Sequence, residues 1–160
     1  MGKKTAYIEL NTTNQIISLH RNHAPKGFSY LGISMFPCVT VTSLSEVLAL
    51  NYDYFVLDMG VLNAYTLKDF LKCDQRFLVC SLSKWKVEKT KEKLENLFQL
   101  NNINTAHVTV LYNLMTEKEN SKFFTFSNLS FPIIAFPFLP NPFQLKPEVF
   151  HAFHQILKNE

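Results

Sequence analysis

The chain has 160 residues, of which 47% are hydrophobic and 18% are charged, and its formal net charge is +3. This length suits one domain with a sizeable core, and the composition excludes wholesale disorder. The charge does not support nucleic-acid binding, because nucleic-acid-binding proteins gather basic residues on one face. The densest basic run, residues 84–97, is interleaved with glutamates and is typical of a solvated helix face.

The cysteines and the longest apolar runs indicate a cellular location. Cys38, Cys73 and Cys80 are odd in number and have no CxxC spacing, which favours reduced thiols over a disulfide framework or a zinc site. No run reaches the roughly 18 apolar residues of a membrane span, and residues 1–10 lack the apolar core of a signal peptide. We therefore expect a cytoplasmic protein.

In the first part of the chain, short apolar runs are separated by polar, glycine or proline residues. Runs rich in aromatic and β-branched residues predict strands, and Ser43 with Glu46 three residues later forms a capping-box pattern. The expected elements are a strand over 5–10, one or two helical turns over 15–20, short strands over 28–33 and 38–41, a helix over 43–50 and a strand over 54–58.

The alternation continues to the end of the chain. The expected elements are helices over 63–73, over 84–99 and from Pro147 onward, and strands over 76–82, 106–113 and 129–138. Strands that are continuous apolar runs and alternate with helices predict an α/β fold, with a largely parallel sheet of about six strands and helices on both faces. We find no internal repeat or linker, so we expect one domain over residues 1–160.

In such a sheet, ligands bind where the strands end. A polar residue there can also be a helix cap or a turn residue, which is the alternative at every one of these positions. The residues that follow the predicted strands are Glu9, Asn11, Asp58, Gly60, Ser81, Ser83, Asn113 and Pro137–Asn141.

Several segments, taken in order, resemble the MinD/ParA-like ATPases, the deviant P-loop group. "YDYFVLDMG" (52–60) resembles their Walker B strand, and "GKKTAYIELN" (2–11) resembles the strand after their phosphate-loop helix. Residues 76–97 resemble the next strand and helix, "VTVLYN" (108–113) the strand whose closing asparagine reads adenine, and "IAFPFLPNPF" (134–143) the loop against the base.

The resemblance implies a P-loop NTPase-like fold with ATP or ADP and Mg²⁺ as cofactors. It implies that Asp58 contacts the metal-bound water, that Glu9 flanks the phosphates, and that both are catalytic candidates. It places Asn113 at the adenine edge and adds Gly60 to the nucleotide-binding residues.

The departures from the family pattern concern hydrolysis. The only glycines are Gly2, Gly27, Gly32 and Gly60, so the phosphate loop G-x-x-x-x-G-K-[ST] is absent from this chain. Glu9 and Asn11 stand where two aspartates are usual, and Asn11 carries no charge. Because Mg²⁺ usually binds carboxylates together with substrate phosphates, Asp58 alone is a poor metal site. We expect no useful rate of ATP hydrolysis.

The leading hypothesis is a non-hydrolysing ATPase-like module that acts through a protein partner or as a homodimer. The resemblance suggests a regulatory or scaffold role in a partitioning, pilus or secretion apparatus. Two alternatives stay open: the C-terminal part of an active MinD/ParA-like ATPase whose Walker A segment is missing from this chain, and an unrelated Rossmann-like binding domain. Weaker candidates are the metal pairs His20/His23 and His151/His154, Cys80 as a nucleophile, and the aromatic segment 123–143 as a partner-binding patch.

Overall fold

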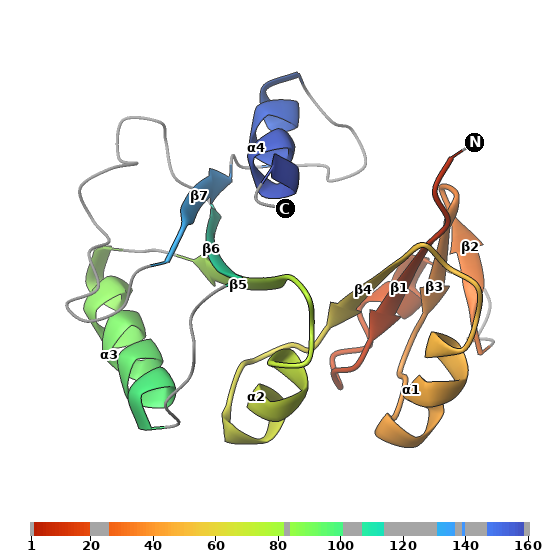
Figure 1. The fold of residues 1–160 in the computed structure, drawn as a ribbon, viewed down its shortest axis with the longest axis horizontal. Helices are drawn as coiled ribbons and strands as arrows, with labels where there is room; N and C mark the ends of the chain where they lie inside the picture. The colour runs from red at the N-terminus through yellow and green to blue at the C-terminus, as the bar shows by residue number, and fades with distance from the viewer. Residues whose placement is uncertain are drawn as a thin grey trace. The chain divides into compact units, whose positions relative to one another are not determined.

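The computed structural model describes residues 2–19, 26–81, 84–100, 107–113, 131–136, 139 and 147–158. Their contacts group into two compact units, Met1–Lys68 and Asp69–Glu160, and each is described by itself (Figure 1). None of the helices in these ranges combines the length and the apolar character needed to cross a membrane.

The first unit is built on a four-stranded sheet in the order β2-β3-β1-β4. Strand β1 is parallel to β3 and to β4, whereas β2 is antiparallel to β3. The elements are β1 (Thr5–Glu9), the 3-10 helix η1 (Ile16–Leu19), β2 (Phe28–Tyr30), β3 (Ile33–Phe36), α1 (Val41–Leu48) and β4 (Tyr54–Asp58); α2 (Ala64–Phe70) spans the boundary with the second unit.

The segment between η1 and α1 differs from the prediction. Strands β2 and β3 form a hairpin around Leu31 and Gly32, whose φ angles of 49° and 82° fit a two-residue turn with both residues left-handed. The strand predicted over 38–41 is therefore wrong, because β3 ends at Phe36.

Helix α1 begins earlier than predicted. Its N-cap is Thr40, whose hydroxyl accepts a hydrogen bond from the Ser43 N–H at 3.3 Å. The Ser43 hydroxyl in turn accepts one from the Thr40 N–H at 3.0 Å. Ser43 is thus the third residue of a capping box instead of its cap.

The two faces of the first sheet carry different kinds of side chain. Ala6 and Ile8 of β1 are fully buried, and their partners in register are Phe55 and Phe36. Both of these rings pack edge-on against Tyr52, with centroid distances of 5.7 and 6.1 Å. Because side chains alternate along a strand, the other face carries Tyr7, Glu9, Val56 and Asp58.

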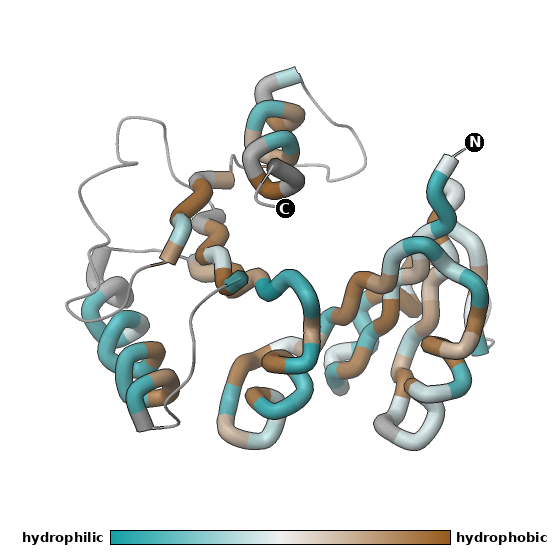
Figure 2. The backbone as a smooth tube through the Cα atoms, in the orientation of Figure 1, coloured by the Kyte–Doolittle hydropathy of each residue, from teal (hydrophilic) through white to brown (hydrophobic). Residues whose placement is uncertain are grey.

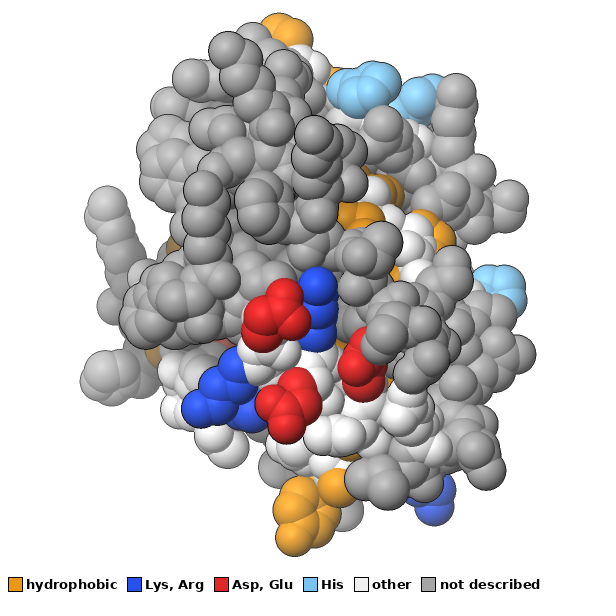
Figure 3. Space-filling model, turned by 90° about the vertical axis from the view of Figure 1, so that its left-hand side faces the viewer, with side chains coloured by type: hydrophobic (Ala, Val, Ile, Leu, Met, Phe, Trp, Pro, Cys, Tyr) orange, Lys and Arg blue, Asp and Glu red, His pale blue; other side chains and the backbone are white. Residues whose placement is uncertain are grey.

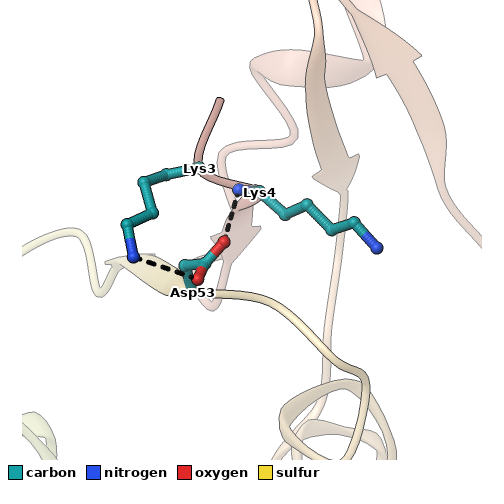
Figure 4. A network of polar contacts seen from close by, with 3 residues as sticks. All are labelled: Lys3, Lys4 and Asp53. Atoms are coloured by element: carbon teal, nitrogen blue, oxygen red, sulfur yellow. Dashed lines mark hydrogen bonds and ion pairs between the residues drawn. The ribbon is translucent and has the colours of Figure 1, made fainter. Parts of the chain in front are cut away.

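The amino ends of β1 and β4 are joined by a small polar network (Figure 4). Asp53 accepts a hydrogen bond from the Lys4 N–H at 2.7 Å and forms an ion pair with Lys3 at 3.4 Å. The Lys4 hydrogen bond is the main reason why the pKa of Asp53 lies below its ordinary value. This exposed network holds the register of the strand pair at the end opposite Glu9 and Asp58.

The second unit contains a three-stranded parallel sheet in the order β5-β6-β7. Its elements are β5 (Arg76–Ser81), α3 (Lys84–Leu100), β6 (Val108–Asn113), β7 (Ile133–Phe136) and α4 (Pro147–Lys158). All five lie where the sequence predicted a strand or a helix. Figure 2 shows apolar residues along these strands and at intervals on the mainly hydrophilic α3.

Aromatic contacts fix α3 and α4 to the second sheet. Phe98 of α3 meets Phe131, just before β7, with ring centroids 5.5 Å apart. Phe153 of α4 meets Phe136 of β7 at 5.3 Å. Both helices therefore pack against the segment that contains β7.

The architecture is α/β with mainly parallel strands. The sequence predicted this class, with about six strands in one sheet. The strands of the described ranges form two sheets, and β2 is antiparallel to its neighbour.

Candidate functional site

Two carboxylates meet at the ends of neighbouring strands. Glu9, the last residue of β1, lies in parallel register with Asp58, the last residue of β4. The Leu10 N–H donates a hydrogen bond to the Asp58 carbonyl at 2.9 Å, which continues the pairing past the strand ends. Since residues in register share a sheet face, the Glu9 and Asp58 side chains leave the same face next to each other.

Both carboxylate oxygens of Asp58 accept hydrogen bonds from the protein. The Tyr7 hydroxyl donates to Oδ2 at 2.7 Å, and the Gly60 N–H donates to Oδ1 at 3.0 Å. Tyr7 precedes Glu9 by two residues in β1, so the strand alternation places it on the same face. Asp58 is therefore a hydrogen-bond acceptor that links β1 to the turn after β4.

The ionisation of Tyr7 follows from this environment. Burial raises the pKa of Tyr7 above its ordinary value, and so does the hydrogen bond to Asp58. The negative charges of Asp58 and Glu9 act in the same direction. The hydroxyl therefore stays protonated and remains a donor over the physiological pH range.

Glu9 is fully buried, with a relative exposure of 0%. Its Oε1 accepts a hydrogen bond from the Gln15 N–H at 2.7 Å, and its carbonyl accepts one from the Val39 N–H at 2.9 Å. Its Oε2 is buried and has no hydrogen-bond partner among the described residues. A buried polar atom without a partner is costly and rare, which marks this carboxylate as the unusual group of the site.

The loops beside the two carboxylates are held by asparagines. Asn11 Oδ1 accepts hydrogen bonds from the Thr13 N–H at 2.9 Å and from the Thr13 hydroxyl. Asn11 Nδ2 donates to the Asp58 carbonyl at 3.4 Å. Asn11, which stands where the resemblance expects an aspartate, is thus a turn-forming residue that also touches the end of β4.

Gly60 and Asn11 are in close contact. Gly60 has a φ of +67°, and a Cβ added to it would lie 2.8 Å from the Asn11 Cβ. Nearby, Cys38 Sγ donates to Asn14 Oδ1 at 2.7 Å, and both residues have positive φ angles, 52° and 55°. Three residues around the site, Asn14, Cys38 and Gly60, therefore have left-handed backbone conformations.

Asn113, the expected adenine-edge residue, belongs to the second unit. It closes β6 in register with Ser81 of β5 and Phe136 of β7. The carboxyl ends of these strands are thus level, which a strand-end site requires. The side chains of Ser81 and Asn113, and residues Ser83, Pro137, Phe138, Pro140 and Asn141, lie outside what the structure describes. The role of Asn113 stays a prediction.

The weaker sequence candidates lie apart from the carboxylates along the chain. Burial raises the pKa of the Cys80 thiol, which lowers the fraction of reactive thiolate. His151 and His154 are exposed on α4, whereas His20 and His23 lie outside the described residues, as does most of the aromatic segment 123–143. No group of three or more His, Cys, Asp or Glu side chains within the described ranges is arranged to hold a metal ion.

The second unit also has a hollow of about 310 Å³ at the amino ends of its strands. Its polar lining includes Arg76, His107 and Thr109. The Arg76 guanidinium donates to the carbonyls of Cys73 at 3.0 Å and Leu71 at 2.9 Å, so it stabilises the turn before β5. The hollow lies at the opposite end of these strands from Ser81 and Asn113.

The residues present do not fit the nucleotide and metal that the resemblance implies. Mg²⁺ is usually held by one or two carboxylates together with substrate phosphates, and the described ranges contain no group of three or more His, Cys, Asp or Glu side chains that could hold a metal ion. The phosphates need a glycine-rich loop and a lysine, and this chain has no such spacing. Glu9 Oε2 has no hydrogen-bond partner, but a single oxygen does not make a magnesium site.

Sequence reasoning missed Tyr7. Asp58, Glu9 and Gly60 were found because they stand at strand ends, and the structure brings all three together. Tyr7 was read only as part of an apolar run. The period of two along β1, which puts Tyr7 on the face of Glu9, was the signal that could have found it.

Comparison with known proteins shows the fold. No protein-family model matches this chain, and no curated protein matches it in sequence. Among solved structures, it is similar to the MinD cell division protein of Aquifex aeolicus, with a TM-score of 0.58 and 13% identity, over 99% of this chain and 85% of that chain. At this identity the likeness shows the fold alone: the chain has a fold similar to that of this MinD structure, which confirms the fold expected from the sequence.

Proposed function

We propose that this chain is a non-hydrolysing module with the MinD/ParA-like fold and that it acts by binding a protein partner or a second copy of itself. The observation that carries the proposal is that both carboxylate oxygens of Asp58 accept hydrogen bonds from the protein itself. The oxygens that would face a metal-bound water in an ATPase are held by Tyr7 at 2.7 Å and by Gly60 at 3.0 Å. The chain also contains no phosphate-loop sequence.

Exposed apolar residues directly after this site support a protein partner. Val61 is 81% exposed and Tyr65 is 92% exposed. Tyrosine is enriched at protein interfaces because its ring buries a large area at a low entropic cost. A partner bound here would contact the segment that follows Asp58 and Gly60. A regulatory or scaffold role in a partitioning, pilus or secretion apparatus is the setting that the resemblance suggests.

The distribution of charge supports a protein partner over a nucleic acid. Figure 3 shows acidic and basic side chains next to one another on one face of the molecule. Helix α3 has a similar mixture, with an ion pair between Lys91 and Glu88 at 3.3 Å. A nucleic-acid site would need a stripe of basic residues.

We also propose a cytoplasmic location and a single domain over residues 1–160. The first is supported by Cys38, Cys73 and Cys80, which are all free thiols. The second is supported by the similarity to one solved chain over 99% of this one.

Calorimetric titration of the purified chain with ATP and ADP, with and without Mg²⁺, tests the proposal together with an assay of phosphate release. We expect no phosphate release above that of the Asp58→Asn variant, because the wild-type carboxylate takes no part in a metal site. Mg²⁺-dependent turnover that Asp58→Asn abolishes would contradict the proposal. It would favour the alternative that this chain is the C-terminal part of an active ATPase.

Sedimentation tests the partner surface. If the partner is a second copy, the wild type self-associates with increasing concentration and the Val61→Ser/Tyr65→Ser variant does not. Association that is unchanged in this variant would rule out the segment after Gly60 as the interface between copies. If the wild type sediments as a monomer at all concentrations, the proposed partner is a different protein.

A further inference from the structure

The hollow at the amino ends of β5 and β6 has the lining of a small ligand site. Its volume is about 310 Å³, which lies at the lower end of the range for pockets that hold small molecules. Phe77, Pro132 and Ile156 provide apolar surface, whereas Arg76 and His107 provide nitrogen donors. The described residues that line the hollow include no Asp or Glu. A ligand that fits this lining is negatively charged at one end and apolar at the other.

Thr109 is the buried polar side chain of this hollow. It is 7% exposed and lies in register with Phe77 of the neighbouring strand, which also lines the hollow. Its hydroxyl forms no hydrogen bond with the part of the chain that the structure describes. Buried hydroxyls are normally hydrogen-bonded, because burial without a partner is costly. A ligand atom in the hollow would supply the missing partner.

The charge at the hollow favours an anion. The Arg76 guanidinium donates to the carbonyls of Cys73 at 3.0 Å and Leu71 at 2.9 Å, and these bonds hold it in place. Both acceptors are neutral, so the two bonds do not cancel the positive charge of the guanidinium. The charge is therefore positioned before a ligand arrives, which lowers the entropic cost of binding.

We propose that this hollow binds a small organic carboxylate with an apolar body. The Thr109 hydroxyl donates to the carboxylate, and the positive charge of Arg76 attracts it. The apolar body lies against Phe77, Pro132 and Ile156. All of these residues belong to the second unit, so the inference goes beyond the proposed function and does not depend on it.

Titration of the purified full chain with sodium benzoate, followed by the amide resonances of the nitrogen-labelled protein, tests this site. Benzoate is a suitable probe because it joins one carboxylate to one ring. We expect saturable shifts at Phe77, His107 and Thr109, with a dissociation constant of about 1 mM or lower. Benzamide keeps the ring but carries no charge, and it should bind at least about tenfold more weakly.

The substitution Thr109→Val removes the hydroxyl and keeps the branched shape of the side chain. We expect it to weaken benzoate binding at least about tenfold, because a hydrogen bond to a charged group is lost. The variant should fold, since the hydroxyl has no hydrogen bond among the described residues to lose. Thr5→Val is the matched control, because it makes the same change in β1, which does not line the hollow. It should bind benzoate as the wild type does.

Three results would overturn the inference. They are an absence of saturable shifts at the three amides in millimolar benzoate, equal affinities for benzoate and benzamide, and an unchanged affinity in Thr109→Val. If Thr109→Val does not fold, the comparison of benzoate with benzamide on the wild type decides by itself. Each of these results leaves the proposal on ATP hydrolysis untouched, since no nucleotide is present.

Discussion

Glu9 and Asp58 have similar carboxylates, and their surroundings give them different roles. Asp58 is partly buried and accepts hydrogen bonds at both oxygens. Glu9 is fully buried, and of its two carboxylate oxygens only Oε1 accepts a hydrogen bond among the described residues. The difference comes from their neighbours, because Tyr7 and Gly60 reach one carboxylate and Gln15 reaches the other. Residue type alone does not distinguish them.

A substitution of Gly60, even by alanine, should destabilise the fold. Alanine there would have to adopt a φ of +67° with its Cβ 2.8 Å from the Asn11 Cβ. We expect Gly60→Ala to lower the free energy of unfolding by about 2 to 4 kcal/mol, the sum of backbone strain and overlap. Urea denaturation measures this loss.

Gly32→Ala is the control for the backbone contribution. Gly32 has a φ of +82°, but an added Cβ would meet nothing within 4 Å. We expect a loss of only about 1 to 2 kcal/mol. Equal losses in the two variants would show that the contact with Asn11 is easily relieved.

The hydrogen bond from Tyr7 to Asp58 predicts a pH dependence. The pKa of Tyr7 in the folded protein is raised, by burial first and by Asp58 next, so the folded state holds this proton more tightly than the unfolded chain does. The resulting stabilisation is complete below the unfolded pKa of about 10 and is lost as the pH rises toward the folded value. The free energy of unfolding should therefore fall more steeply above pH of about 10 in the wild type than in Tyr7→Phe.

Urea denaturation at a series of alkaline pH values measures both profiles. The two proteins share their other five tyrosines, so the difference between the profiles isolates Tyr7. Parallel profiles would show that Tyr7 titrates as an ordinary tyrosine and that its bond to Asp58 does not persist in solution.

Among the elements, the helices of the second unit depend on a few buried rings. Phe98 is 1% exposed and packs against Phe131, which joins α3 to the strand segment at β7. Phe98→Ala should lower the free energy of unfolding by about 3 to 5 kcal/mol, because it leaves a cavity in this contact. Thermal or urea unfolding followed by circular dichroism measures the loss.

Phe150→Ala on α4 is the matched control, since its ring is 57% exposed. The expected change is within about 0.5 kcal/mol. A large effect at Phe150 would mean that this ring is covered in solution, and a small effect at Phe98 would mean that α3 contributes little to the core.

A comparison of predicted and observed elements shows which of them the sequence pattern was sufficient to predict. Strands β1 and β4 through β7 are short apolar runs, and the sequence predicted each of them. The hairpin of β2 and β3 was misjudged, because its turn at Leu31 and Gly32 looks like the inside of an apolar run. The start of α1 was misplaced for a similar reason: Thr40 and Ser43 are both good caps, and only the backbone of Thr40 is extended.

For the whole molecule, the fold is inferred from structural similarity, whereas the activity is inferred from the residues at the strand ends. The similarity to the Aquifex aeolicus MinD structure has a TM-score of 0.58 at 13% identity, so the fold is shared although most residues differ. A fold of this kind serves many functions, and the chemistry depends on the residues at the strand ends. In this chain those residues form hydrogen bonds with each other, which is why we propose binding instead of hydrolysis.

The sequence by itself determined the α/β class, most of the elements, and the candidates Glu9, Asp58 and Gly60. These depend on local composition and on periods of two and 3.6 residues, which are readable along the chain. Only the tertiary structure decided that Tyr7 bonds to Asp58, that Glu9 is fully buried, and that Gly60 lies against Asn11. The Tyr7–Asp58 and Gly60–Asn11 contacts join residues that are far apart in sequence, and they exist because β1 and β4 pair in one register. A shift of that register by one residue would turn Tyr7 and Glu9 away from Asp58.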